Sequence, residues 1–290
     1  MPFQFVRSAL FFSPSMTCAL SAHDKDSIEL LFVGGKAMIS VDLQQIRKEI
    51  DQVNRQMSEL FDKREELSRQ VAEYKKVNKT PVLNSQREEE ILDKWAKKSP
   101  FKRKFFMNIM TLSRNLQTKL LLDRHIVLIG LMGCGKSTAG KIVANALDIP
   151  LKDTDAEVEK REGMTVSEIF ATKGEEYFRK VEAEEIERLT KSEKPCVIST
   201  GGGVVLSEKN MAVLKEKGYV FFIHRTPDEI AKHVNTQKRP LLKDGPQKLY
   251  EIYNNRIHLY KGYADYIIEK NSSPNTTAGE IINTLQSTEL

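Results

Sequence analysis

The feature that most constrains the fold is a short glycine-rich segment between a β-branched run and a helical pattern. The run "HIVLIG" leads into "GLMGCGKS", which spans Gly130 to Ser137, and an amphipathic stretch follows. The spacing satisfies GxxxxGK[ST] in the strand–loop–helix setting that this motif requires. Backbone N–H groups of such a loop and of the following helix N-terminus bind phosphate groups. We therefore expect a nucleotide-binding α/β domain.

The side chains of this loop have separate expected tasks. Lys136 would reach the β- and γ-phosphates of ATP, and Ser137 would coordinate Mg²⁺. Cys134 occupies a variable position, so we expect no catalytic role for it. The remaining nucleotide contacts are predicted along the loop and the first helical turn: Gly130, Met132, Gly133, Cys134, Gly135 and Thr138.

The bulk composition limits the classes of protein that this chain can belong to. The 290 residues are 40% hydrophobic and 29% charged, as in soluble globular proteins, and the net charge is only +5. No apolar run approaches the ~18 residues that span a bilayer. Cys18, Cys134 and Cys196 are widely separated, which favours a reducing compartment over disulfides or zinc. We expect a cytoplasmic protein that binds neither membrane nor nucleic acid.

The residue patterns divide the chain into three parts. Residues 1–40 show no sustained periodicity, and we expect an irregular extension there. A targeting peptide and a true start at Met38 are alternatives for this extension. Residues 41–122 are predicted to be helical. In residues 123–290, β-branched runs alternate with helical stretches, which predicts a parallel α/β sheet.

A long helix is predicted from Val41 to Tyr74–Lys76 because apolar residues recur in steps of four and three. The seam comprises Ile46, Ile50, Val53, Met57, Leu60, Leu67, Val71 and Tyr74. An uninterrupted seam of this length is typical of a helix that packs against a partner helix.

Polar residues interrupt the packed side of this helix. Arg47, Asn54, Arg64 and Lys75 lie close together in angle, because separations of 17 and 11 residues return to nearly the same face. Solvated side chains are one interpretation, but several buried cations on one stripe call for an anionic ligand. Arg47 and Arg64 are about 25 Å apart along the axis, so one small ligand can meet both only if Arg47 comes from a second subunit. The stripe therefore predicts an intertwined homodimer.

Two further helices are predicted in the same half. Pro81 ends the first helix, Asn84-Ser85 caps the second, and Glu88 suggests a capping box with Ser85. The third helix is expected over Phe105–Leu122. Ser113 and Gln117, four residues apart, are polar positions on its apolar face.

The helical half resembles the all-helical class of chorismate mutase. The resemblance rests on "IRKEIDQVNRQMSELFDKREELSRQVAEYK", "PVLNSQREEEIL" and "SRNLQ", and it implies an intertwined three-helix dimer. It implies that substrate is bound by Arg47 from the second subunit and by Arg64, Lys75, Asn84, Arg87, Glu88, Ser113 and Gln117. Asn84 stands where the bacterial pattern often has an acid.

The residue types suit the rearrangement of chorismate to prephenate. The substrate carries two carboxylates, which arginines bind in bidentate fashion. A pericyclic reaction needs no nucleophile, so catalysis depends on conformer selection and on charge stabilisation at the breaking ether bond. Lys75 and Gln117 are the catalytic donors that we expect at the ether oxygen.

The α/β half carries several polar motifs beyond the phosphate-binding loop. "LKDTDAEVE" places Asp153 and Asp155 at the end of a predicted strand, where ligands bind in open α/β sheets. Arg179 and Glu182 lie three residues apart on a predicted helix. "CVISTGGGVVL" ends a strand in Gly201, Gly202 and Gly203, which is typical of close backbone approach to a ligand.

These motifs together resemble shikimate kinase over residues 124–288. The resemblance implies a five-stranded parallel sheet of order 2-3-1-4-5, as in nucleoside-monophosphate kinases. It implies that shikimate is bound by Asp155, Arg179, Glu182, Gly201, Gly202, Gly203 and Arg256. Asp155 would deprotonate the attacking hydroxyl, and Asp153 would act on Mg²⁺ through water. Arg239, in "KRPLL", would close from a lid, and Lys232 and Pro274 would flank the adenine.

Three functional readings stay open at this stage. The first is a bifunctional enzyme of aromatic amino-acid biosynthesis, with shikimate kinase and chorismate mutase activities. In the second, the helical half is a regulatory module that binds chorismate or prephenate. In the third, the α/β half phosphorylates another hydroxy acid such as gluconate, which leaves the paired arginines and the glycine run less well explained.

Overall fold

The computed structural model describes residues 27–28, 41–232, 246–269 and 273–290. The chain divides into two compact units, Met1–Lys63 and Arg64–Leu290, and the division falls within the first long helix. Most of residues 1–40 lie outside the described residues. The two-residue strands β1 (Ser27–Ile28) and β2 (Val41–Asp42) pair antiparallel. This pairing removes residues 41 and 42 from the helix, which therefore begins later than the sequence predicted.

Three helices form the first half of the described chain: α1 (Leu43–Asn78), α2 (Ser85–Trp95) and α3 (Pro100–Leu121). α1 ends where Lys79 adopts a left-handed conformation with φ of 50°. α3 begins five residues before the predicted Phe105, because the Ser99 side chain caps it and Pro100 occupies its first turn. The predicted start missed this cap.

The seam of α1 is apolar, yet its side chains are exposed in the described part of the chain. Ile50 and Val53 are each 52% exposed, and Leu60 is 66% exposed. The other seam residues from Ile46 to Tyr74 are exposed as well. Burying apolar side chains of this size is favourable by roughly 1.5–3 kcal/mol each. Association of the seam with another apolar surface would therefore be strongly favourable.

The second half is built on the predicted five-stranded parallel sheet. Its strands are β3 (His125–Ile129), β4 (Leu151–Asp153), β5 (Val197–Ser199), β6 (Gly218–His224) and β7 (Tyr266–Glu269). The spatial order β4-β5-β3-β6-β7 is the predicted order 2-3-1-4-5, and every neighbouring pair is parallel. The central strand β3 is buried along its whole length, as expected for a sheet covered on both faces.

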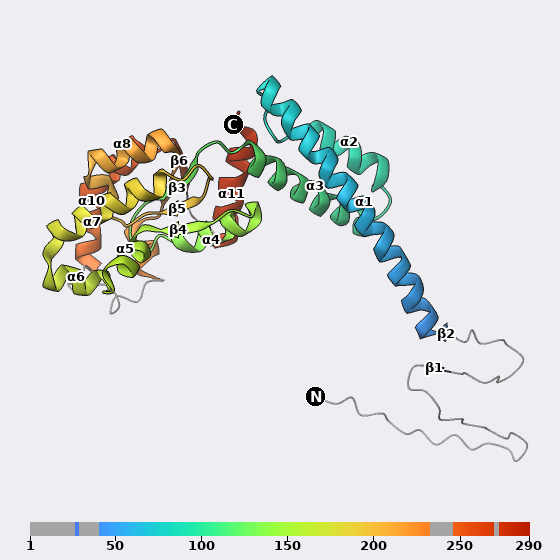
Figure 1. Cartoon of the computed structure of the whole chain (residues 1–290), viewed down its shortest axis with the longest axis horizontal. Coiled ribbons are helices and arrows are strands. Elements are labelled where there is room, and N and C mark those ends of the chain that lie inside the picture. The colour runs from blue at the N-terminus through green and yellow to red at the C-terminus, as the bar shows by residue number, and fades with distance from the viewer. Residues whose placement is uncertain (1–26, 29–40, 233–245, 270–272) are drawn as a thin grey trace, which may run out of the picture. The chain divides into compact units, whose positions relative to one another are not determined.

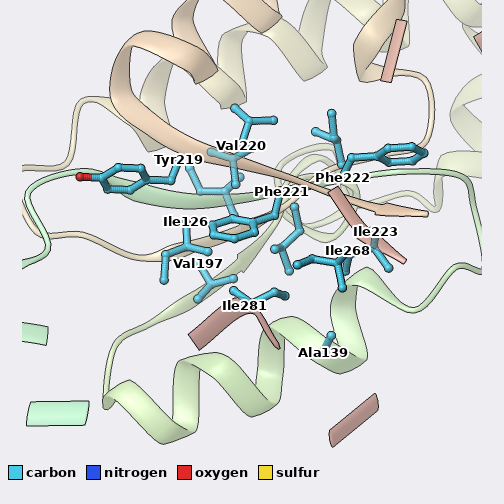
Figure 2. Close-up of a cluster of buried hydrophobic side chains, with 14 of the residues drawn as sticks. Ile126, Ala139, Val197, Tyr219, Val220, Phe221, Phe222, Ile223, Ile268 and Ile281 are labelled. Carbon is cyan, nitrogen blue, oxygen red and sulfur yellow. The ribbon is translucent and has the colours of Figure 1, made fainter. Parts of the chain in front are cut away.

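Helices cover both faces of this sheet (Figure 1). The helices of this half are α4 (Lys136–Leu147), α5 (Thr154–Glu162), α6 (Val166–Thr172), α7 (Gly174–Thr190), α8 (Glu208–Lys217), α9 (Pro227–Ala231), α10 (Pro246–Tyr263) and α11 (Pro274–Ser287), with a short 3₁₀ turn at Val204–Leu206. α6 packs on α5 and α7. Figure 2 shows Ile281 of α11 below the strand residue Val197, and Ala139 of α4 farther along the same side of the sheet; these residues are fully buried. α4 and α11 therefore share the layer that supports the phosphate-binding loop.

Residues 64–122 pack against the α/β half within one compact unit. α3 contacts α4 and α11, and Lys119 of α3 lies 2.5 Å from Asp148 after α4. The two halves are thus connected by side-chain contacts as well as by the short segment between α3 and β3. Within the described part of the chain, no helix combines the length and the apolar character needed to cross a membrane.

Candidate active sites

The glycine-rich loop after β3 has a backbone that only glycine adopts easily. Gly130 has φ of +145°, and a Cβ there would lie 2.7 Å from the carbonyl oxygen of Ile223. Gly135 is left-handed and precedes α4 without any side-chain cap. The first N–H groups of α4 consequently face the loop without a side-chain acceptor, which suits a phosphate group.

The polar side chains of the loop lie at the carboxyl edge of the sheet. Lys136 is buried, and its Nζ donates to the carbonyls of Gly130 (2.7 Å) and Leu131 (3.0 Å). The Ser137 hydroxyl donates to Asp153 Oδ2 at 2.7 Å and lies 3.1 Å from Ser199 Oγ. The predicted pair of Ser137 and Asp153 therefore meets, and Ser199, which the sequence reading missed, joins it.

The donor set around Ser137 determines which ion it suits. Among the described residues, no group of three or more His, Cys, Asp or Glu side chains is placed to hold a metal ion. A hydroxyl and a single carboxylate suit Mg²⁺, which keeps several waters and takes further oxygens from substrate phosphates. The residues present fit Mg²⁺ carried by a nucleotide better than a metal held by protein alone.

A cavity of about 350 Å³ lies beside this loop. Its lining includes all seven residues predicted to bind shikimate. The full lining is Met132, Asp155, Glu159, Val166, Ser167, Phe170, Phe178, Arg179, Glu182, Gly201, Gly202, Gly203 and Arg256. The apolar members Phe170, Phe178 and Val166 were not predicted. They come from α6 and α7, and nothing in their short apolar pattern separated them from ordinary core residues.

Asp155 combines burial with nearby negative charge. Burial and the carboxylates of Asp153 and Glu182 raise its pKa to about 6, although Lys136 and Arg179 act in the opposite direction. Gly201 lies directly against it, and a Cβ at Gly201 would come within 2.5 Å of Asp155 Oδ1. The glycine therefore provides the space in which the carboxylate lies. A carboxylate with a pKa of this value can accept a proton near neutral pH.

Arg179 and Glu182 form the ion pair that their spacing predicted, at 2.8 Å. Glu182 is fully buried, and burial raises its pKa although Arg179 opposes the shift. Its other oxygen, Oε1, is among the few buried side-chain polar atoms of the described residues that have no hydrogen-bond partner. A Cβ at Gly203 would lie 2.3 Å from Arg179 Nη2, so this glycine makes room for the guanidinium.

Arg256 reaches the cavity from α10. Its Nη1 donates to the carbonyl of Gly202 at 3.0 Å, and the hydroxyl of Tyr260 donates to the same oxygen. Tyr260 is fully buried, and burial raises its pKa, so the hydroxyl stays protonated as a donor. Tyr260 was missed, although its position four residues after Arg256 on one helix face was available in the sequence.

The residues predicted to contact adenine and to form the lid lie outside this cavity or outside the described residues. Lys232 is exposed at the end of α9, and Pro274 lies in the first turn of α11. Neither is part of the cavity lining. Arg239 lies outside the described residues.

A second cavity, of about 220 Å³, lies among α1, α2 and α3. Within Arg64–Leu290, every residue that the resemblance to chorismate mutase predicted to bind substrate lines this cavity. Its lining is Arg64, Leu67, Ser68, Val71, Lys75, Val82, Asn84, Arg87, Glu88, Ile91, Met110, Ser113, Arg114 and Gln117. Arg47 belongs to the other compact unit and is exposed on α1.

Arg64 is partly buried in this cavity, as its place on the packed side of the first helix predicted. Burial lowers the pKa of its guanidinium. Its Nε is buried and, within the described part of the chain, has no hydrogen-bond partner. An unsatisfied buried donor of a charged group costs about 1–3 kcal/mol, so an anionic ligand here would recover that free energy.

Lys75 and Gln117 meet from opposite helices. Lys75 Nζ donates to Gln117 Oε1 at 3.0 Å and to the carbonyl of Val82. Burial lowers the pKa of Lys75, an effect that Glu88 opposes and Arg114 reinforces. The two predicted catalytic donors are therefore adjacent although 42 residues separate them in sequence.

The cap of α2 differs from the predicted one. Asn84 is the N-cap and accepts from the backbone N–H of Arg87 at 2.9 Å. Glu88 does not form a capping box with Ser85; its carboxylate pairs with Arg114 of α3. The capping-box prediction was wrong because a charge-assisted contact between helices competes with the local backbone bond. Arg114 itself was not predicted as a site residue.

Two family models match the chain in non-overlapping segments. The shikimate kinase model matches residues 132–286. The chorismate mutase type II model matches residues 46–118. The segments correspond to the two cavities, one in the α/β half and one among the three helices.

Similar proteins and solved structures agree with the first match. A shikimate kinase of Caldicellulosiruptor bescii is 43% identical over 163 residues, which is 55% of this chain and 94% of that protein. A bifunctional shikimate kinase/3-dehydroquinate synthase of Thermotoga maritima is 37% identical over 57% of this chain and 33% of that protein.

Among solved structures, shikimate kinase from Acinetobacter baumannii in complex with shikimate is similar, with a TM-score of 0.55 and 31% identity. The match covers 58% of this chain and 96% of that one. The kinase from Aquifex aeolicus gives a TM-score of 0.51 and 36% identity over 56% of this chain and 96% of that one. The chain thus belongs to the shikimate kinase family and carries a chorismate mutase type II domain before the kinase, the architecture of a bifunctional enzyme of aromatic amino-acid biosynthesis.

Proposed function

We propose that the chain phosphorylates shikimate with ATP and also rearranges chorismate to prephenate. The observation that best supports the kinase activity is that Asp155, Arg179 and Arg256 line one cavity beside the phosphate-binding loop. A base and two fixed cations are what a hydroxylated carboxylic acid requires for binding and activation. The same cations make shikimate a better fit than an uncharged sugar.

ATP with Mg²⁺ is the proposed phosphoryl donor, and it supplies the transferable γ-phosphoryl group. The loop glycines and the N-terminus of α4 would hold its phosphates, and Ser137 with Asp153 would face the ion. Lys136 would exchange its contacts with the loop carbonyls for phosphate oxygens. The resemblance assigns the remaining roles: Arg239 would close over the phosphates from a lid, and the adenine would lie between Lys232 and Pro274.

The shikimate end of the reaction depends on residues already aligned in the cavity. Asp155 would accept the proton of the attacking hydroxyl. Arg179 and Arg256 would hold the carboxylate, with Arg179 braced by Glu182 and Arg256 by Gly202. Glu182 Oε1 has no hydrogen-bond partner among the described residues, and a substrate hydroxyl that donates to it would supply one.

The mutase site is proposed in the helical cavity. Arg64 and Arg87 would bind the substrate carboxylates, and Asn84, Glu88 and Ser113 would contact its polar substituents. Lys75 and Gln117 would donate to the ether oxygen as charge develops there.

A homodimer would complete this site. The exposed seam of α1 would be covered by the same helix of a second chain, and that chain would contribute its Arg47. We propose residues 41–122 as the mutase domain, residues 123–290 as the kinase domain and residues 1–40 as an extension. Among the described residues, Cys134 and Cys196 are buried and form no disulfide, which supports a cytoplasmic location. The partners that we propose are the two small-molecule substrates, without nucleic acid or membrane.

Paired assays on one purified sample test the proposal. Phosphorylation is measured with shikimate and, as the matched competitor, gluconate, and prephenate formation is followed from chorismate. We expect shikimate turnover without gluconate turnover, together with mutase activity. Gluconate turnover at a comparable kcat/KM would overturn the kinase assignment, and inert chorismate would overturn the mutase assignment.

A regulatory role for the helical domain is the second candidate. It is favoured by the contacts of α3 with α4, the helix that carries Lys136 and Ser137 at its start. A ligand that shifts α3 would thereby act on the phosphate-binding loop. Kinase kinetics with and without prephenate test this role, and unchanged kcat and KM at saturating prephenate would exclude it.

A further inference from the structure

The last turn of the kinase domain contacts residues next to the mutase cavity, including Arg114, which lines it. Gln286, at the end of α11, is 1% exposed, and its polar groups are directed to the helical half. Its Oε1 accepts from Arg114 Nε at 2.9 Å, and its Nε2 donates to Asn115 at 3.1 Å. The contact joins residues 172 positions apart in sequence. A buried amide with both ends satisfied in this way has one strongly preferred orientation.

Arg114 is held from two sides by these contacts. Nε faces Gln286, whereas Nη1 pairs with Glu88, and both Arg114 and Glu88 line the cavity. The side chains of Arg114 and Glu88 are only 17% and 26% exposed, so their pairing is weakly screened. Because the guanidinium is planar, a bond to Nε fixes the direction in which Nη1 points.

The backbone of Gln286 provides a second connection. The last carbonyls of a helix have no partner within it, and the Gln286 carbonyl accepts from the N–H of Leu83 at 2.8 Å. Leu83 follows Val82, whose carbonyl accepts from Lys75. Gln286 thus contacts both the arginine that pairs with Glu88 and the loop that orients the proposed catalytic lysine.

We propose that Gln286 of the kinase domain is a positioning residue of the mutase site. It acts through Arg114, which it orients so that Glu88 and Arg114 present fixed charges to the dianionic substrate. The inference rests on the proposed mutase function. It makes mutase turnover dependent on the C-terminal helix of the kinase, which a mutase domain alone would not provide.

Gln286→Leu in the full-length chain tests the proposal, because leucine keeps the size and the backbone contact but removes both side-chain hydrogen bonds. We expect mutase kcat/KM to fall about tenfold, the loss typical of one hydrogen bond to a charged group. The fall should appear mainly in KM, since Arg114 and Glu88 contact substrate and transition state alike. Gln286→Glu, which retains an acceptor for Arg114, should keep activity within about threefold. Shikimate kinase kinetics on the same sample report whether the fold is intact.

A double-mutant cycle separates positioning from general packing. In an Arg114→Met background, Gln286→Leu should have no further effect on mutase kcat/KM, because Gln286 acts through Arg114. Additive losses would contradict this route. Asp148→Ala is the matched control: it breaks the exposed contact with Lys119 between the same two halves, and mutase activity should not change. An equal loss in Asp148→Ala and Gln286→Leu would assign the effect to domain packing and overturn the proposal.

Binding of prephenate by calorimetry distinguishes failure of this inference from failure of the proposed function. If the wild-type chain neither converts chorismate nor binds prephenate, the mutase assignment fails, and the role of Gln286 with it. If the wild-type chain is active and Gln286→Leu binds prephenate and turns over chorismate within twofold of it, only the inference fails. A tenfold weaker affinity for prephenate in Gln286→Leu supports it.

Discussion

The helical cavity and the kinase cavity hold opposite balances of charge. Among its described lining residues the helical cavity has four cationic side chains, Arg64, Lys75, Arg87 and Arg114, against the single carboxylate of Glu88. The kinase cavity has three carboxylates, Asp155, Glu159 and Glu182, against Arg179 and Arg256. Each cavity also has one buried polar side-chain atom that lacks a hydrogen-bond partner among the described residues. In the helical cavity it is the donor Nε of Arg64, and in the kinase cavity it is the acceptor Oε1 of Glu182.

The difference follows from what each reaction demands. A pericyclic rearrangement moves no proton, so fixed cations and neutral donors suffice to hold a dianion and stabilise its ether oxygen. Phosphoryl transfer to a hydroxyl needs a proton acceptor. Asp155 is the proposed acceptor, and burial, together with the carboxylates of Asp153 and Glu182, raises its pKa to about 6. In the proposed function, excess positive charge thus serves binding in one cavity, and a buried carboxylate among other carboxylates serves proton transfer in the other.

The largest effect that separates the two sites is expected from Lys136→Ala. The substitution removes the cation that would face the transferring phosphoryl group, so kinase activity should fall on the order of 10³-fold. Mutase activity should be retained, because Lys136 is buried in the loop of the other cavity. Both activities are measured on one preparation, and loss of both would show that the sites are not independent.

Asp155→Asn should lower kinase kcat by roughly 10²–10⁴-fold, because the amide cannot accept the proton. It should also stabilise the ligand-free fold at pH 7. The folded-state pKa of Asp155 is raised from 3.8 to about 6, so its contribution to stability decreases as pH rises through that window. A rise of this size corresponds to about 3 kcal/mol, so removing the charge should add up to about that amount at pH 7, and the gain should vanish below pH 4. Thermal unfolding at both pH values checks the sign, and a destabilised variant at pH 7 would refute it.

Mixing Arg47→Ala and Arg64→Ala chains tests whether the helical site is shared, unlike the kinase site. Each variant alone should lose mutase activity. A hybrid dimer regains one intact site, so about a quarter of all sites should recover after random exchange. Exchange is verified by mass spectrometry of differently tagged chains. Absence of recovery despite exchange would place Arg47 outside the site, and kinase activity should stay constant throughout as the internal control.

The pH profiles of the two activities should differ in shape. Kinase kcat/KM should fall as pH drops through about 6, because protonated Asp155 is no base. Mutase kcat/KM should be flat across neutral pH, since Gln117 does not titrate there. Burial lowers the pKa of Lys75, so mutase activity should decline on the alkaline side earlier than an exposed lysine would allow. Parallel profiles would contradict the contrast between the two cavities.

Ionic strength should give the smallest of these differences. The excess of cations in the helical cavity attracts a dianion through partly screened charge, so the KM for chorismate should rise a few-fold between about 0.05 and 0.5 M salt. The KM for shikimate should change less, because its cavity has mixed charge. Steady-state titrations in potassium chloride, with sucrose at matched viscosity as control, measure both. Equal salt dependence would indicate that net lining charge does not govern affinity.

The sequence predicted much of the fold because its strongest signals are local. The glycine loop, the seam of α1 and the β-branched runs each depend on residues within a few positions, and the sheet order followed from the family resemblance. The predictions failed where two local signals competed. Glu88 resembled a capping-box acid, but its carboxylate meets Arg114, which lies 26 residues away. α3 began at Pro100 rather than Phe105 because its cap lay outside the apolar pattern.

The sequence by itself indicated the two chemistries. The spacing of Gly130 to Ser137 marks the phosphate-binding loop, and the resemblance to the two families assigned roles to Asp155, Arg64 and Lys75. Only the tertiary structure decided which groups support them. Ser199, Tyr260, Arg114 and Gln286 are ordinary residues in sequence and acquire a role through contacts across as many as 172 positions. Such contacts depend on how helices and strands pack, because burial makes each polar group find a partner, and no local pattern specifies which partner that is.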